Sequence, residues 1–264
     1  MKISVCGKGG SGKSTVVALL ADEARSRGYQ VLVVDSDESN AGLFRILGFS
    51  QPPVPLMEIV GGKKKIISTL RDPASSEFEG KAVVLTQERI AIEDIPAENM
   101  VERDNLRLVS VGKILQALEG CACPFGVLSR EFLKRLTIKE NELVIVDMEA
   151  GVEHFGRGVE ESVDSVLIVV DPSFESLELA GRINSLANGT GIKNVSAILN
   201  KVPSDDIASR LEGELVKRSI RVIGCIHHDS ELFDSSLEGG TLRAGGAAEE
   251  IRGVLDSVLS KARW

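Results

Sequence analysis

Residues 7–15 read Gly7-Lys8-Gly9-Gly10-Ser11-Gly12-Lys13-Ser14-Thr15 and match the GxxxxGK[ST] pattern of a phosphate-binding loop. The pattern stands between a short β-branched run, Ile3–Cys6, and an amphipathic stretch, Thr15–Arg27, which is the strand–loop–helix context that it requires. Glycines let several backbone N–H groups turn toward a polyphosphate, and the N-terminus of the following helix adds roughly half a positive charge. We therefore expect this loop to bind the phosphates of a nucleotide.

Two side chains of the loop have expected roles in that chemistry. Lys13 should reach the β- and γ-phosphates, and the Ser14 hydroxyl should ligate Mg²⁺. The alternative, a glycine-rich turn without a ligand, is disfavoured because motif and context agree. The residues expected to contact the phosphates are Gly9, Gly10, Ser11, Gly12, Lys13, Ser14 and Thr15.

Outward from the loop, short apolar runs alternate with helical patterns. Their apolar residues are nearly continuous rather than alternating, which favours strands covered on both faces of a parallel sheet. The predicted strands are Ile3–Cys6, Val31–Asp35, Leu106–Val111, Leu143–Asp147, Val166–Val170, Val195–Asn200 and Val222–Ile226. Helical spacing is clearest in Thr15–Arg27 and Ala247–Lys261. The pattern predicts an α/β fold: a doubly wound, mostly parallel sheet with helices on both faces.

The segment 50–105 interrupts this alternation. It opens with Gln51-Pro52-Pro53-Val54-Pro55, carries Lys63-Lys64-Lys65, and then becomes acidic. We interpret it as a surface insert in one domain that spans residues 1–264. Two alternatives are a solvated flap and a surface that docks a partner.

Composition and charge argue against several classes of function. The net charge is −8 and aromatic residues make up 4%, which disfavours nucleic-acid binding by phosphate neutralisation or base stacking. No apolar run reaches the length of a membrane span. The first residues resemble a strand rather than an export signal, and the chain has four cysteines. We therefore expect a cytoplasmic protein without disulfides or a membrane partner.

Polar residues follow several of the predicted strands. Asp37 comes just after the second strand, Asp147 ends the run from Leu143, and Gly151 follows soon after. A single Asp at a strand end is often a turn or helix-capping residue, but two of them in order with a phosphate loop favour a shared site. Asn200 ends a later strand, where an ordinary turn is the alternative.

The paired lysines of the loop resemble the deviant Walker A motif of the MinD/ParA/nitrogenase-iron-protein group of P-loop ATPases. The resemblance implies ATP with Mg²⁺ and a homodimer in which Lys8 crosses to the partner's nucleotide. It implies that Asp37 orients or activates the attacking water and that Asp147 holds Mg²⁺ through water. It also implies that the N–H of Gly151 faces the γ-phosphate and that Asn200 binds the adenine edge.

A second motif, Cys121-Ala122-Cys123-Pro124, offers two thiols to a soft metal ion. A tetrahedral site takes four ligands, so a two-fold dimer would complete it. The alternatives are two cysteines without a role and a redox pair. The histidines, His154, His227 and His228, lie in other segments.

The loop, the Cys-x-Cys pair and the stretch 146–158 together resemble the CooC-type ATPases that mature nickel enzymes. The resemblance implies an ATP-dependent chaperone that binds Ni²⁺, with Zn²⁺ competing, at Cys121 and Cys123 of both copies of a homodimer. Its client would be carbon monoxide dehydrogenase or acetyl-CoA synthase. Two departures are Glu149, where relatives have small residues, and the pair His227-His228, where many have a proline-containing turn.

Three rival functions remain open at this point. A MinD-like positioning ATPase would need a basic amphipathic C-terminal helix, but the tail from Glu249 is mixed in charge. A ParA-like DNA-segregation ATPase is disfavoured by the net charge. An iron-protein-like reductase would take its cluster cysteines from two separate segments, which the Cys-x-Cys spacing does not match.

Overall fold

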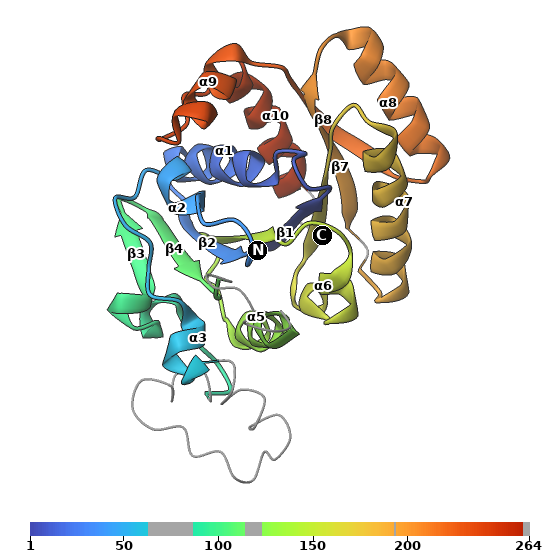
Figure 1. The fold of residues 1–264 in the computed structure, drawn as a ribbon. Coiled ribbons are helices and arrows are strands. Elements are labelled where there is room, and N and C mark those ends of the chain that lie inside the picture. Colours follow the sequence, from blue (N-terminus) through green and yellow to red (C-terminus); the bar gives the residue numbers. More distant parts are fainter. Residues whose placement is uncertain (63–86, 114–122, 193, 261–264) are drawn as a thin grey trace.

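In the computed structural model, the described residues are 1–62, 87–113, 123–192 and 194–260. They form one eight-stranded sheet with helices on both faces (Figure 1). The strand order is β3-β4-β2-β5-β1-β6-β7-β8. All neighbouring strands are parallel except β3 and β4 at one edge. The predicted fold class is therefore confirmed.

The strands are β1 (Lys2–Gly7), β2 (Gln30–Ser36), β3 (Met100–Arg103), β4 (Leu106–Ser110), β5 (Glu142–Met148), β6 (Ser165–Val170), β7 (Val195–Val202) and β8 (Arg221–His227). The α-helices are α1 (Lys13–Ser26), α2 (Leu43–Ile46), α3 (Leu56–Ile59), α5 (Cys123–Arg135), α6 (Glu153–Gly156), α7 (Phe174–Gly189), α8 (Asp205–Lys217), α9 (Ser230–Glu238) and α10 (Ala247–Ser260). Short 3₁₀ turns are η3 (Ile92–Asp94), η4 (Ala97–Asn99) and η5 (Val159–Ser162).

A separate hydrophobic core lies on each face of the sheet. In β2, Val31 and Val33 belong to the core beneath α1 and α10, whereas Leu32 and Val34 belong to the core beneath α5, α7 and α8. Successive side chains of a strand point to opposite faces. Because both faces are covered, both sets of positions must be apolar, which explains the continuous apolar runs.

The segment 50–105 is more ordered than a solvated flap where the structure describes it. Leu56 of α3 and Ile90 and Ile92 around η3 are almost fully buried and belong to the core beneath α5. The segment also supplies β3, which pairs antiparallel with β4 and which the sequence did not predict. Its ends therefore extend the sheet and one of its cores.

The C-terminal helix α10 is a core helix. Its apolar residues Ile251, Val254, Leu255 and Val258 are buried against α1 and β8. This apolar face is therefore already occupied and is not available to lie on a membrane. Within the described ranges, no helix is both long and apolar enough to cross a bilayer.

The strand order determines where the functional residues meet. β5 lies between β1 and β2, so the loop after β1 and the carboxyl ends of β2 and β5 lie side by side at the carboxyl end of the sheet (Figure 1). Asp35 of β2 and Asp147 of β5 are register partners. In open α/β sheets, this edge is where ligands bind.

Candidate functional site

The loop between β1 and α1 is shaped by glycines in left-handed conformations. Gly10 has φ +79° and Gly12 has φ +94°. A Cβ atom on Gly12 would lie 2.2 Å from Nδ2 of Asn200, and one on Gly7 would lie 2.5 Å from the carbonyl oxygen of Val169. Only glycine fits these approaches. Gly12 precedes the 14-residue α1 without a side chain to cap it, so the helix N-terminus stays available to an anion.

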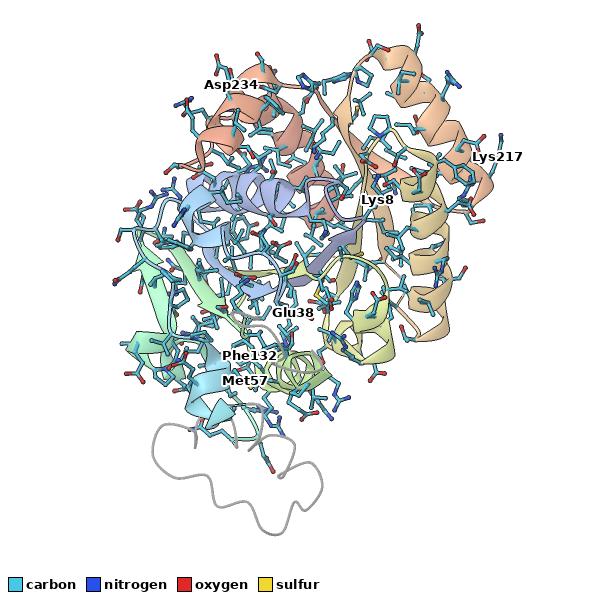
Figure 2. The ribbon with its side chains drawn as sticks, in the orientation of Figure 1. Lys8, Glu38, Met57, Phe132, Lys217 and Asp234 are labelled. Carbon is cyan, nitrogen blue, oxygen red and sulfur yellow. The ribbon has the colours of Figure 1, made fainter. Side chains whose placement is uncertain are left out.

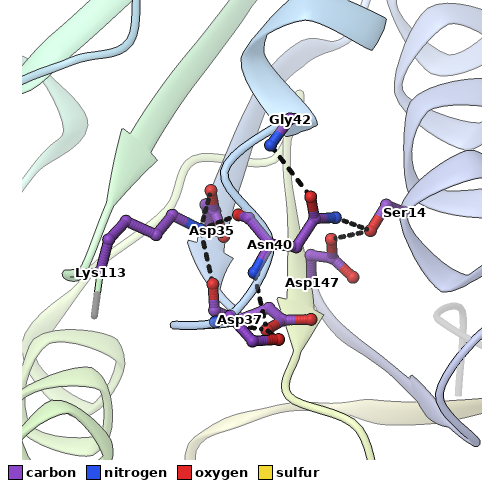
Figure 3. A network of polar contacts seen from close by, with 8 residues as sticks. Ser14, Asp35, Asp37, Asn40, Gly42, Lys113 and Asp147 are labelled. Carbon is purple, nitrogen blue, oxygen red and sulfur yellow. Dashed lines mark hydrogen bonds and ion pairs between the residues drawn. The ribbon is translucent and has the colours of Figure 1, made fainter. Parts of the chain in front are cut away.

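Lys13 and Ser14 are the first two residues of α1, directly after the loop. The Lys13 side chain is largely buried, and its Nζ donates to the carbonyl oxygen of Lys8 at 3.3 Å, curling back over the loop. Ser14 Oγ donates to Asp147 Oδ2 at 2.6 Å and accepts from Asn40 Nδ2 at 2.9 Å (Figure 3). The structure thus brings together Ser14 and Asp147, which are far apart in the sequence.

The oxygen atoms at this point suit Mg²⁺. Asp147 is fully buried, and its Oδ1 has no hydrogen-bond partner among the described residues. Burial, followed by the repulsion of Asp35, raises the pKa of Asp147 to about 7. A divalent cation beside it would favour the carboxylate form, and a hydroxyl with a carboxylate is a donor set that Mg²⁺ accepts.

Asp37 is held within its own loop. Its Oδ1 accepts from the backbone N–H of Ser39 at 2.9 Å and from the Ser39 hydroxyl at 2.6 Å. Asn40 follows in the same loop and reaches Ser14, so the loop closes over the end of α1 (Figure 3). These contacts place Asp37, which is buried, beside the Ser14–Asp147 pair.

Lys113 secures this loop from a distant part of the chain. Its Nζ donates to Asp35 Oδ1 at 2.7 Å, to the carbonyl oxygen of Asp37 at 2.5 Å and to that of Asn40 (Figure 3). Despite this ammonium group, burial raises the pKa of Asp35 to about 6. Asp35 thus holds Lys113 in position, and Lys113 in turn binds the carbonyl oxygens of the loop.

Lys8 makes its contacts within its own chain. Its Nζ donates to Ser173 Oγ at 2.9 Å and lies 3.3 Å from Asp171 Oδ2. Both partners lie in the short connection between β6 and α7, and Figure 2 labels Lys8 in the phosphate loop. Lys8 is therefore paired with an acid of its own chain in this structure.

Gly151 and Asn200 both touch the phosphate loop. The N–H of Gly151 donates to the carbonyl oxygen of Gly7 at 3.3 Å. Asn200 Nδ2 donates to the carbonyl oxygen of Ser11 at 2.8 Å, and Lys201 Nζ donates to that of Gly10 at 2.9 Å. Asn200 therefore braces the loop in this structure.

A cavity of about 370 Å³ lies beside Asn200. Its size is compatible with a nucleobase. The lining residues are Thr15, Asn200, Lys201, His227, His228, Asp229, Leu232, Phe233, Ser236 and Leu237. His227 itself pairs with carboxylates, since its Nδ1 lies 2.6 Å from Glu250 Oε1 and its Nε2 lies 3.2 Å from Asp205 Oδ1.

Charged residues also join the loops that follow β2 and β5. Arg157 Nη1 donates to Glu149 Oε2 at 2.9 Å and lies 3.8 Å from Glu38 Oε1. Burial, together with the nearby Glu149 carboxylate, raises the pKa of Glu38 to about 7. Glu149, the departure from the resemblance, is therefore part of an ion-pair cluster.

The predicted metal motif, Cys121-Ala122-Cys123, lies at the boundary of the described residues. Cys121 and the side chain of Cys123 lie outside the described residues, although the backbone of Cys123 begins α5. Among the residues that are described, His, Cys, Asp and Glu side chains form no group of three suited to a metal ion. Cys225 has a pKa raised to about 11, chiefly by burial, so it is a neutral thiol at neutral pH.

Sequence reasoning missed four residues of this site: Asn40, Lys113, Asp171 and Lys201. Asn40 lies in the same loop as Asp37, so it could have been found from its position. Lys201 directly follows Asn200 and has φ +59°, but a left-handed backbone at a residue other than glycine cannot be recognised in the sequence. Lys113 and Asp171 meet partners that are distant in the sequence, and no local pattern identifies them.

Comparison with known proteins places the chain among nucleotide-binding proteins. The family model described as the CobQ/CobB/MinD/ParA nucleotide binding domain matches residues 3–242. An uncharacterized ATP-binding protein of Methanocaldococcus jannaschii is 44% identical over 261 residues, covering 99% of this chain and 100% of the relative. The carbon monoxide dehydrogenase accessory protein CooC of Rhodospirillum rubrum is 37% identical over 205 residues, covering 77% of this chain and 75% of CooC.

A solved structure supports the fold independently. The crystal structure of the cell division ATPase MinD of Pyrococcus furiosus superposes with a TM-score of 0.68 at 19% identity and covers 98% of both chains. At that identity, the likeness concerns the fold alone.

Proposed function

The chain belongs to the CobQ/CobB/MinD/ParA nucleotide-binding family of P-loop ATPases, and we propose that it uses ATP to deliver nickel to a metalloenzyme. One observation carries the proposal: a chain 37% identical to CooC over 77% of its length also carries the Cys121-x-Cys123 pair. The proposed client is carbon monoxide dehydrogenase or acetyl-CoA synthase.

The nucleotide site supports the ATPase half of the proposal. Lys13 and the N-terminus of α1 would hold the phosphates, while Ser14 and Asp147 would hold Mg²⁺. The ion, when bound, neutralises charge on the phosphate oxygens. Thr15 and Asn200 border the cavity that would take the base. The orphaned Oδ1 of Asp147 is the feature of the chain that favours a cation at this point.

Hydrolysis in this proposal depends on Asp37 and on a second copy of the chain. Asp37 orients or activates the attacking water, and the hydrogen bonds from Ser39 keep its carboxylate in the loop beside Ser14. Lys8 leaves Asp171 and reaches the nucleotide of the partner. Loss of the γ-phosphate then releases the loops around Asp37 and Gly151.

Nickel is the cargo in this proposal. Cys121 and Cys123 of two copies would supply four thiolates at the two-fold axis, a number that suits one divalent ion. Zn²⁺ would compete for such a site, since four thiolates also suit its tetrahedral preference. The ion would be released to the client when the dimer loosens after hydrolysis.

The test is an equilibrium titration with Ni²⁺ and with Zn²⁺ under reducing, anaerobic conditions. We expect one ion per dimer, dimerisation by metal alone, and loss of both in Cys121→Ser and Cys123→Ser. Cys225→Ser is the matched control and should titrate as the wild type does. One ion per monomer, or unchanged affinity in Cys123→Ser, would falsify the shared site, and a brown [4Fe–4S] absorbance would favour a reductase instead.

A further inference from the structure

Arg157 lies where three parts of the molecule meet. Its guanidinium donates to Glu149 in the loop after β5, at 2.9 Å, and faces Glu38 in the loop after β2, at 3.8 Å. Glu38 is 4% exposed, and its Oε1 has no hydrogen-bond partner in the described part of the chain. Figure 2 shows Glu38 in the interior, between the phosphate loop and α5. One cation therefore bridges the loop after β2 and the loop after β5.

The aliphatic part of Arg157 rests on α5. A Cβ atom on Gly126 would lie only 2.2 Å from Cδ of Arg157 and 3.1 Å from its Cγ. Any other residue at position 126 would thus displace this side chain. Gly126 is in the first turn of the helix that Cys123 begins.

Two further contacts fasten α5 to the same loops. Arg130 Nη1 donates to the carbonyl oxygen of Arg157 at 3.1 Å. The hydroxyl of Ser129 lies 2.7 Å from that of Ser36, at the end of β2. Because Gly126, Ser129 and Arg130 are all on α5, movement of either loop would displace the whole helix.

We propose that Arg157 is a positioning residue that transmits the state of the nucleotide to α5 and thereby to Cys123. Its guanidinium group contacts the loops after β2 and β5 through Glu38 and Glu149, and the aliphatic part of its side chain packs on the first turn of α5 at Gly126. A displacement of either loop changes the contacts of the guanidinium group, and the packed aliphatic part transmits this displacement to α5. The consequence for metal binding rests on the proposed function, but the link to α5 does not.

The experiment measures amide hydrogen exchange with and without ATP and Mg²⁺. In the wild type, we expect ATP to slow exchange about fivefold or more in a peptide covering residues 124–135 of α5. In Arg157→Ala, peptides of the phosphate loop should keep their ATP-dependent protection, whereas the response of α5 should disappear. General destabilisation would raise exchange in both nucleotide states and leave the difference, so it would not imitate this result.

Gly126→Ala reaches the same contact from the other side. It should also abolish the ATP response of α5. The double variant Arg157→Ala, Gly126→Ala should lose no more of this response than either single variant, because each variant breaks the same contact. Gly213→Ala is the matched control, since a Cβ at that helical glycine meets nothing within 4 Å. It should respond to ATP as the wild type does.

Three outcomes would overturn the proposal. They are an unchanged response of α5 in Arg157→Ala, no response of α5 in the wild type, and loss of ATP-dependent dimerisation in Arg157→Ala on a sizing column. The last would mean that Arg157 acts on association rather than on α5. None of these readouts uses metal, so failure of the nickel proposal in the titration leaves this test intact.

Discussion

The Nζ atom of Lys8 lies 3.3 Å from Oδ2 of Asp171 in the same chain, although the family resemblance assigns Lys8 to the partner's nucleotide. The ammonium group is partly exposed, with 31% of the side chain accessible, and a pair of this kind contributes at most about 1 kcal/mol. Such a contact is weak enough for ATP to replace, so it can hold Lys8 in the monomer without blocking assembly.

This relationship predicts opposite effects for its two partners. Lys8→Ala should impair dimerisation on ATP more than nucleotide binding. Asp171→Asn should favour the dimer by up to about fivefold per copy, the factor that corresponds to about 1 kcal/mol, and therefore by up to roughly 25-fold in the dimerisation constant, because both copies lose the pair. Sizing chromatography across a range of protein concentrations with ATP and Mg²⁺ measures both. Normal dimerisation of Lys8→Ala would remove the crossing role from this residue.

Asp37→Asn should bind ATP but hydrolyse it about 10²–10⁴ times more slowly, because an amide cannot take a proton from water. The variant should therefore accumulate as the ATP-bound dimer. Steady-state phosphate release together with nucleotide affinity gives the result. Lys13→Ala is the comparison, since it should abolish hydrolysis through loss of the phosphate contact. A rate near that of the wild type in Asp37→Asn would assign the role elsewhere.

Lys113→Ala should lower the free energy of unfolding by about 3–5 kcal/mol, because it leaves Asp35 buried and unpaired. The loop that carries Asp37 also loses two backbone contacts, so hydrolysis should slow as well. Denaturant unfolding measures the first effect and phosphate release the second.

Two comparisons test this explanation of Lys113. The double variant Asp35→Asn, Lys113→Met should recover much of the stability, since no charge is then left buried alone. Lys139→Ala, which breaks an exposed pair with Glu93, should lower the free energy of unfolding far less than Lys113→Ala does. If Lys113→Ala lowers the free energy of unfolding no more than Lys139→Ala does, the buried pair of Lys113 and Asp35 contributes little to stability.

The stability of the C-terminal region should depend on pH through His227. Hydrogen bonding to Glu250, assisted by Asp205, raises the pKa of His227 above its ordinary value. The protonated form is therefore the stabilising one: its contribution is complete below the pKa of the unfolded chain and is lost as pH rises through the folded pKa. The difference in unfolding midpoint between wild type and His227→Gln should thus be larger at pH 5.5 than at pH 8.5.

His228→Gln is the control for this effect, because its ring lies against Phe233 rather than between carboxylates. It should show no such trend. The side chain of His227 is 38% exposed, so solvent screening keeps the expected shift small. A difference that is constant across this pH range would contradict the assignment.

The sequence alone determined the seven strands other than β3, and the phosphate loop, because these depend on local physical requirements. A strand covered on both faces must be apolar throughout, as Leu143–Val146 is, and a loop around phosphates needs glycine where φ is positive, as at Gly10 and Gly12. The aspartate at the end of β5 could also be recognised, because a charged residue after such a run marks the edge of the sheet. The meeting of Ser14 with Asp147 then follows from the parallel strands.

Only the tertiary structure decided which of the many charged residues meet. Lys113 is 78 residues from Asp35, and Arg157 belongs to a different crossover from Glu38, so no sequence spacing relates them. No sequence spacing relates Lys8 to Asp171 either. The family resemblance implies that Lys8 reaches a partner across a dimer, whereas its contact with Asp171 depends on β6 lying beside β1. A surface lysine or arginine can pair with any acid within reach. Which acid comes within reach is set by the packing of strands and helices far apart in the chain.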